Sequence, residues 1–272
     1  MSLFVMDYQD AFHTLPAADN EYHLQIFISS PGVFELFVTV VFGSKTAPLV
    51  WGRAGAFLSR SGQALFDPKE LLLETYVDDP FAAIAGDAYA RLRRAAVLLT
   101  WWRAVGPNMS WAKADKGAVV KWIGADVLVA DRFTVTASLP PAFVADLIAE
   151  TRRLRQMAMA PLDDVRKFAG KGSWASGVGP ALRNYLQPLW AVIGEAARKE
   201  AANPEAQDKE AGSHKRKRWS RERIHTVRIA TTLNWLLALL TGRGRKPVME
   251  RTMDWRVAFA PLSILVTADA SP

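Results

Sequence analysis

The spacing of hydrophobic and polar residues changes about halfway along the chain. Short apolar runs at residues 2–6 and 71–73 predict strands, and residues 119–127 predict a strand pair or hairpin. Two further strands are expected over residues 23–28 and 33–42. From Leu139-Pro140-Pro141 onward, apolar residues recur at helical spacing instead. A strand-rich first half followed by a helix-rich second half predicts an α+β fold.

Two helices are expected between the strands of the first half. Thr46 can cap one of them, with Pro48 in its first turn. Residues 87–104 predict the other, which Gly106-Pro107 ends; residues 110–113, which follow, are expected to be extended. The apolar stripe expected on this second helix consists of Ala88, Leu92, Ala95, Ala96, Leu99 and Trp102.

Four helices are expected in the second half. The first covers residues 142–157, the second starts at Asp163-Asp164 and is interrupted by Gly170 and Gly172, and the third covers residues 182–197. The stripe of the fourth consists of Ile224, Val227, Ala230, Leu233, Leu236, Leu237 and Leu240.

A polar stretch at residues 201–213 and a basic run at residues 215–218 separate the third and fourth helices. We interpret the run as part of a solvated linker. Contact with nucleic-acid phosphate and a nuclear address are the alternatives.

Composition narrows the classes of protein. The chain has 272 residues, 50% of them hydrophobic, which allows one large domain or two small ones. Without cysteine it has no disulfide, thiolate metal site or cysteine nucleophile, and its 4 histidines show no His-x-x-x-His spacing for zinc. The net charge of +7 favours phosphates or an anionic membrane surface as partners.

The lengths of the apolar runs and the first residues of the chain bear on where the protein is located. They are shorter than the roughly 20 residues that span a bilayer, and the first residues show no signal-peptide pattern. We therefore expect a protein of the nucleus or cytoplasm, neither secreted nor transmembrane.

The strongest candidate for chemistry is Tyr76-Val77-Asp78-Asp79, at a tight turn between two predicted strands. Adjacent carboxylates repel, and a divalent cation such as Mg²⁺ removes that cost. The alternative is an ordinary turn in which Asp accepts backbone hydrogen bonds. A metal site would need a third acid, and Asp7, at the end of the first strand, is either that site residue or a helix cap.

The order of these segments resembles the order of the motifs in a reverse transcriptase palm. Among such enzymes, the resemblance is strongest to a retrotransposon polymerase. The matching motifs are residues 7–12, 42–48 and 76–79, then Lys113, then Trp122-Ile123-Gly124. The resemblance covers about residues 3–190. Residues 266–271 are similar to the first strand and first aspartate, Asp269, of an RNase H domain.

The resemblance implies two-metal phosphoryl transfer. Asp7 and Asp78 would bridge two Mg²⁺ ions, or Mn²⁺ in their place, with Asp79 in support. Lys113 would act as the general acid on pyrophosphate. The implied partners are an RNA or DNA template with its primer and deoxynucleoside triphosphates.

The resemblance also implies how substrate is held. Phe12 would exclude a ribose 2′-hydroxyl, and Phe42 stands where many retroviral enzymes carry a glutamine that contacts the nucleotide. The remaining substrate-binding candidates are Gly43 and Pro48 under the template base, Tyr76 and Val77 near the primer end, and Trp122, Ile123 and Gly124 gripping the primer. The alternative for Phe12, Val77, Trp122 and Ile123 is plain core, and for Lys113 a solvated charge.

The implied domains are a palm at residues 1–130, a helical thumb or connection at 131–200, a basic polar linker at 201–222, and a helix with the start of a truncated RNase H-like domain at 223–272. The fingers would lie before Met1. The expected activity is therefore that of a polymerase fragment, inactive alone. The alternative is a retroelement relic that binds nucleic acid through its basic surface.

Overall fold

The computed structural model describes residues 1–131, 134–201, 223–242 and 249–254. The described residues form two compact units, one of residues 1–136 with residues 252–254, and the other within residues 137–251. Both units mix helices with small antiparallel sheets, which confirms the α+β prediction at that level. Among the described residues, no helix is both long and apolar enough to cross a bilayer.

The first unit is built around a four-stranded sheet of order β4-β5-β1-β6. Its strands are β1 (Ser2–Val5), β4 (Leu71–Tyr76), β5 (Asp79–Ile84) and β6 (Asp115–Gly117). Neighbouring strands are antiparallel throughout. The central pair is β1 and β5, in which Val5 lies opposite Phe81. The ends of these two strands bring the first and third motifs together.

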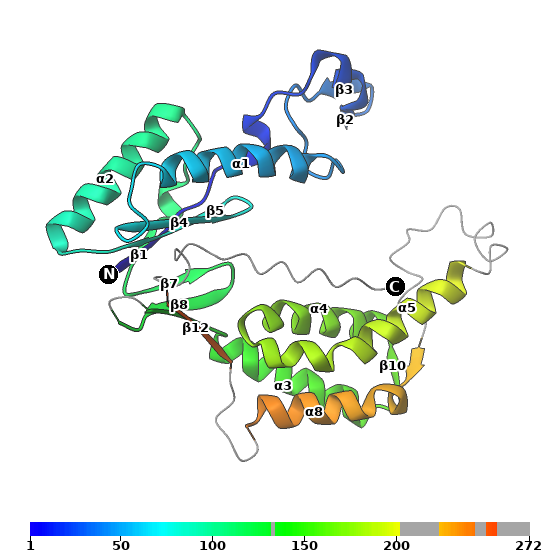
Figure 1. Ribbon diagram of the computed structural model, residues 1–272. Coiled ribbons are helices and arrows are strands. Elements are labelled where there is room, and N and C mark those ends of the chain that lie inside the picture. The colour runs from blue at the N-terminus through cyan, green and yellow to red at the C-terminus, as the bar shows by residue number, and fades with distance from the viewer. Residues whose placement is uncertain (132–133, 202–222, 243–248, 255–272) are drawn as a thin grey trace, which may run out of the picture. The chain divides into compact units, whose positions relative to one another are not determined.

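Helices α1 (Ala47–Gln63) and α2 (Ala88–Val105) cover one face of this sheet (Figure 1). Trp51 and Leu58 of α1 and Leu98 and Trp102 of α2 share one buried core with the strand side chains below them. The Asp87 side chain caps α2 by accepting a hydrogen bond from the Ala90 backbone N–H at 2.8 Å.

The stripe predicted for α2 is wrong in part. Leu92 is 69% exposed, whereas Leu98, outside the predicted stripe, is fully buried. Apolar residues crowd the last two turns of α2 on several faces, so spacing alone could not select the face that meets the sheet.

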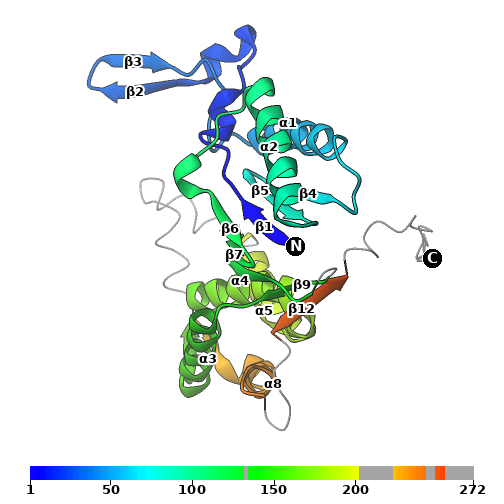
Figure 2. The ribbon, with the colours of Figure 1, turned by 90° about the vertical axis from the view of Figure 1, so that its left-hand side faces the viewer.

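A second sheet of the order β12-β9-β8-β7 contains the predicted hairpin. It is formed by β7 (Val119–Trp122) and β8 (Ala125–Val129), followed by β9 (Thr134–Ser138) and β12 (Glu250–Asp254). The other predicted pair forms a separate hairpin, β2 (Ile26–Ser30) and β3 (Val33–Leu36), which extends away from α1 and α2 (Figure 2). Residues 19–24 form a 3-10 helix. The strand predicted over residues 23–28 therefore starts later, at Ile26.

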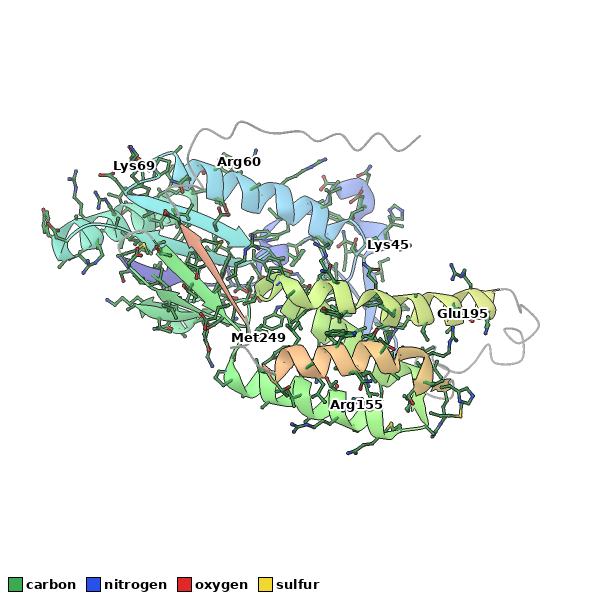
Figure 3. All side chains as sticks on the ribbon, turned by 60° about the horizontal axis from the view of Figure 1, so that its bottom comes forward. Lys45, Arg60, Lys69, Arg155, Glu195 and Met249 are labelled. Carbon is green, nitrogen blue, oxygen red and sulfur yellow. The ribbon has the colours of Figure 1, made fainter. Side chains whose placement is uncertain are left out.

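The second unit is a helical bundle. It contains α3 (Pro141–Gln156), α4 (Leu162–Val178), α5 (Gln187–Ala201) and α8 (Ala230–Leu240), with a short pair, β10 (Met159–Pro161) and β11 (Arg223–His225). Leu154, Val165, Leu189 and Leu233, one from each helix, are fully buried in its core. Figure 3 shows Arg155 on α3 and Glu195 on α5 with their side chains at the surface. Hydrogen bonds and ion pairs with Arg228 and Lys199 lower the pKa of Glu195 to about 2.

Two predictions for this bundle are wrong. Gly170 and Gly172 do not interrupt α4, which runs through both. Ile224 belongs to β11 and Val227 is 78% exposed, so the last helix starts only at Ala230. Pairing between β11 and β10 holds residues 223–225 extended, and residues 226–229 form a 3-10 helix before α8. Helical spacing does not reveal this effect of tertiary structure.

Candidate active site

The turn between β4 and β5 is the centre of the candidate site. Tyr76 pairs with Asp79, leaving Val77 and Asp78 as a two-residue turn. Val77 has φ of +54°, in the left-handed region. A β-branched side chain is strongly disfavoured there, and such strain is typical of functional turns.

Four consecutive carbonyls of this turn each accept a hydrogen bond from elsewhere in the unit. Two donors are tryptophan indoles and two are backbone amides that follow β1. The pairs are Trp51 Nε1 to Val77 O at 2.7 Å, Tyr8 N to Asp78 O at 2.8 Å, Trp122 Nε1 to Asp79 O at 3.0 Å and Met6 N to Pro80 O at 3.0 Å. The turn is therefore held from α1, from the end of β1 and from the β7–β8 hairpin.

The end of β1 places Asp7 beside this turn. The register that pairs Val5 with Phe81, continued by two residues, puts Asp7 opposite Asp79. Residues opposite each other in an antiparallel pair present their side chains on the same face. The carboxylates of Asp7 and Asp79 thus share the face that carries Phe81.

The charges of the neighbouring carboxylates act on Asp79. Burial raises the pKa of Asp79 above its ordinary value, and the charges of Asp78 and Asp7 raise it further, while Lys113 opposes them. The Lys113 ammonium lies 2.9 Å from Asp7 Oδ2. This hydrogen bond raises the pKa of Lys113.

Lys113 reaches Asp7 through a local structure that was predicted wrongly. Residues 111–113 form a 3-10 turn and not an extended segment. The Ser110 backbone N–H donates to Asp7 O at 2.9 Å, which ties this turn to the end of β1. The local pattern of hydrophobic and polar residues could not predict that contact, because it joins residues more than 100 positions apart.

Aromatic side chains adjoin the turn on its α1 side. Phe12 is buried, and its ring meets Phe42 edge-on at 4.9 Å and Trp51 at 6.2 Å between centroids. Phe42 is 74% exposed. Gly43 follows with φ of +100°, and Pro48 lies in the exposed first turn of α1.

The β7–β8 hairpin adjoins the turn on its other side. Trp122 stacks on Phe81 with centroids 4.8 Å apart. Ile123 and Gly124, both at positive φ, form the tip of the hairpin. The segments that sequence placed far apart are therefore gathered around one turn.

Two sets of residues differ from the prediction: some predicted residues lie outside the described part of the chain, and some residues at the turn were not predicted. Asp269 and the basic run at residues 215–218 lie outside the described residues. Sequence reasoning missed Trp51 and Tyr8. The only signal for Trp51 was its position on the small-residue stripe of Ala47, Gly55 and Gly62, which marks the buried face of α1.

The fit of these residues to a metal ion is incomplete as the side chains stand. In the part of the chain that the structure describes, no three His, Cys, Asp or Glu side chains are gathered to hold a metal. The donor chemistry does suit Mg²⁺, since Asp7, Asp78 and Asp79 offer hard carboxylate oxygens. The Lys113 ammonium stands at Asp7 where a cation would be attracted.

Comparisons with known proteins bear on the fold. No family model and no curated protein matches the sequence. The chain is similar to the foamy viral protease-reverse transcriptase dRH in complex with double-stranded DNA, with a TM-score of 0.56 and 13% identity over 88% of this chain and 35% of that one. It is also similar to the foamy viral protease-reverse transcriptase in complex with RNA/DNA hybrid, with a TM-score of 0.51 and 14% identity over 86% of this chain.

The low identity and the partial coverage of both structures limit what the similarity shows about this chain. The chain spans about a third of the length of the first structure and 27% of the second. At such low identity the likeness concerns the fold alone. The chain therefore has a reverse-transcriptase-like fold.

Proposed function

We propose that this chain is the palm and thumb part of an RNA-directed DNA polymerase of a retrotransposon-like element. The observation that carries the proposal is the meeting of Asp7, Asp78, Asp79 and Lys113 around one turn, in a reverse-transcriptase-like fold.

The proposed reaction extends a primer by one deoxynucleotide. The primer 3′-hydroxyl loses its proton to water as its oxygen forms a bond to the α-phosphorus of the triphosphate, the bond from that phosphorus to the bridging oxygen breaks, and pyrophosphate leaves. Bound Mg²⁺ would lower the pKa of the hydroxyl and neutralise phosphate charge. Asp7 and Asp78 would hold the ions, with Asp79 in support. Lys113 would donate a proton to the leaving pyrophosphate oxygen.

The neighbouring residues supply the proposed substrate contacts. Phe12 would lie under the sugar and reject a 2′-hydroxyl. Phe42, Gly43 and Pro48 would line the nucleotide and template base. Tyr76, Val77 and the Trp122–Gly124 tip would meet the primer end, and Tyr76 and Val77 are 57% and 47% exposed, as such contact requires.

The second unit would hold the template-primer duplex by its backbone. The foamy viral proteins of similar fold are described in complex with double-stranded DNA and RNA/DNA hybrid. Both kinds of duplex are proposed ligands of this chain.

Primer extension on an RNA template with Mg²⁺ tests the proposal. The assay should use the chain and the longest polypeptide that contains it. Asp78→Asn is expected to reduce incorporation by ~10²-fold or more. Asp146→Asn, which removes an exposed carboxylate paired with Lys171 in the second unit, is the control. Where the parent polypeptide extends the primer, equal incorporation by Asp78→Asn would show that the site is assigned wrongly.

A second candidate is a non-catalytic module that binds nucleic acid through its basic surface. The pairing of Lys113 with Asp7 favours it, because a lysine held there neutralises a carboxylate without any metal. Under this alternative, duplex binding persists in Asp78→Asn while no variant extends a primer.

A further inference from the structure

We propose that Trp51 is a positioning residue that holds the β4–β5 turn in the conformation that sets Asp79 opposite Asp7. The inference rests on the proposed function, because it concerns how the candidate metal site is kept ready. Trp51 belongs to α1 and touches neither carboxylate directly, so it would act through the backbone of the turn.

The contacts of Trp51 join three parts of the site. Its indole N–H donates to Val77 O at 2.7 Å. Its ring meets Tyr8, the residue after Asp7, edge-on at 5.6 Å, and Phe12 at 6.2 Å. The side chain is 2% exposed, so its orientation is fixed by packing.

The turn needs such a support. Val77 lies at φ of +54°, where its branched side chain is sterically disfavoured. A turn of this kind persists only where its surroundings determine it. The hydrogen bond from Trp51 falls on the carbonyl of the strained residue itself, whereas the backbone bond from Tyr8 falls on the next carbonyl.

The helix makes room for this contact. A Cβ built on Gly55 would lie 3.6 Å from Val77 O and 3.7 Å from Trp51 Nε1. Those are ordinary van der Waals distances, so the turn, the indole and the α1 backbone are already close-packed at this point. The contact is therefore part of the packing of α1 on the turn and not a chance approach of a surface side chain.

Trp102 provides a matched control. It is 1% exposed and meets the same Tyr8 ring edge-on at 6.2 Å. Its Nε1 has no hydrogen-bond partner of ordinary geometry among the described residues. Changing either tryptophan to phenylalanine removes similar buried volume, but only Trp51→Phe removes a bond to the turn.

The consequence for metal binding follows from preorganisation. Apparent affinity falls in proportion to the fraction of molecules in the competent conformation. Without the indole N–H, Val77 can leave the left-handed region, and Asp79 then loses its fixed place opposite Asp7. We expect Trp51→Phe to weaken Mn²⁺ binding by about fivefold, the effect of losing one net hydrogen bond.

Two measurements on the intact chain test the inference. Electron paramagnetic resonance titration with MnCl₂ gives the dissociation constant, and hydrogen exchange gives the protection of the Tyr8 amide bonded to Asp78 O. Both variants should lower Tm through lost packing, and Trp51→Phe should lower it further because it also loses the hydrogen bond to Val77 O. Trp51→Phe alone should weaken Mn²⁺ binding and speed Tyr8 exchange, each by about fivefold over Trp102→Phe, the effect of one net hydrogen bond.

The outcomes separate this inference from the proposed function. If wild type binds Mn²⁺ in an Asp78-dependent way and Trp51→Phe matches Trp102→Phe in both measurements, the positioning role is wrong and the metal site stands. If Tyr8 exchange responds to Trp51→Phe but wild type binds no Mn²⁺, the support of the turn stands and the metal site is wrong.

Discussion

Single residues around the β4–β5 turn carry a cost that the rest of the fold must offset. Asp79 is the clearest case. Burial and the charges of Asp78 and Asp7 raise its pKa, so the folded state disfavours the ionised carboxylate more than the unfolded chain does. A cation bound at the proposed site would offset this cost.

The pH dependence of stability should reveal this cost. Because the folded pKa of Asp79 is raised, the penalty is absent below the unfolded value near 3.8 and develops as the pH rises above it. In metal-free buffer at pH 7, Asp79→Asn should be more stable than wild type by less than about 1 kcal/mol, since solvent screens the partly exposed group. Thermal unfolding from pH 3 to 7 measures the difference. A constant difference at every pH would contradict this origin.

Tyr8 gives a second test at the residue scale. Its side chain is 1% exposed, and burial raises the pKa of its hydroxyl. The Trp102 indole offsets that shift in part, yet neither Tyr8 Oη nor Trp102 Nε1 makes a hydrogen bond of ordinary geometry among the described residues. Tyr8→Phe should therefore leave the free energy of unfolding unchanged or raise it by about 1 kcal/mol. Urea unfolding measures this change. A fall in the free energy of unfolding of about 2 kcal/mol or more would show that the Tyr8 hydroxyl has a hydrogen-bond partner.

Sequence alone was informative for the acidic residues and not for their supports. Asp7, Asp78 and Asp79 stand out because carboxylates at strand ends suggest chemistry. The roles of Trp51 and Tyr8 depend on a positive φ at Val77 and on contacts between distant segments. Neither leaves a local pattern of hydrophobic and polar residues.

At the scale of elements, the glycines of α4 show where sequence rules mislead. Glycine is a poor helix former, which is why Gly170 and Gly172 suggested an interruption. Gly172 instead packs against Leu186, and a Cβ there would lie 2.6 Å from Leu186 Cδ2. Gly170 is exposed, and a Cβ added to it would meet no atom within 4 Å.

The two glycines form a matched pair of substitutions. Gly170→Ala should stabilise the chain by up to about 1 kcal/mol through helix propensity. Gly172→Ala should destabilise it by about 1 kcal/mol net, because overpacking against buried Leu186 outweighs the same gain. Thermal unfolding of both variants measures the two shifts. Equal shifts would show that α4 is not packed on Leu186 in this way.

The hairpins were predictable at this scale because their signals are local. Short apolar runs beside a tight turn mark β4–β5 and β7–β8. The buried face of α2 and the start of α8 depend on neighbouring elements. Periodicity alone does not show which face is buried or where a helix begins.

At the scale of the whole molecule, the order of motifs predicted the fold better than any single motif did. The likeness to two foamy viral structures agrees with that order at 13% and 14% identity. The resemblance implied roles for Lys113 and Trp122 at the site, but their contacts with Asp7 and Asp79 require the complete topology of the first unit and could not be predicted from the local pattern.

Nucleic-acid binding should follow the net charge of +7. Affinity for an RNA/DNA hybrid is expected to fall by at least about tenfold between roughly 50 and 200 mM salt, because phosphate contacts release counterions. Fluorescence anisotropy with a labelled hybrid measures it. An affinity that stays constant across this range would exclude binding through the basic surface.

The central question is whether the carboxylates around the turn bind a divalent cation. Electron paramagnetic resonance titration of the chain with MnCl₂ should show saturable binding that Asp78→Asn removes and that Asp146→Asn leaves intact. Saturable binding lost in Asp78→Asn would support the metal site and the proposed phosphoryl transfer. Equal binding by wild type and Asp78→Asn, or none by wild type, would contradict it.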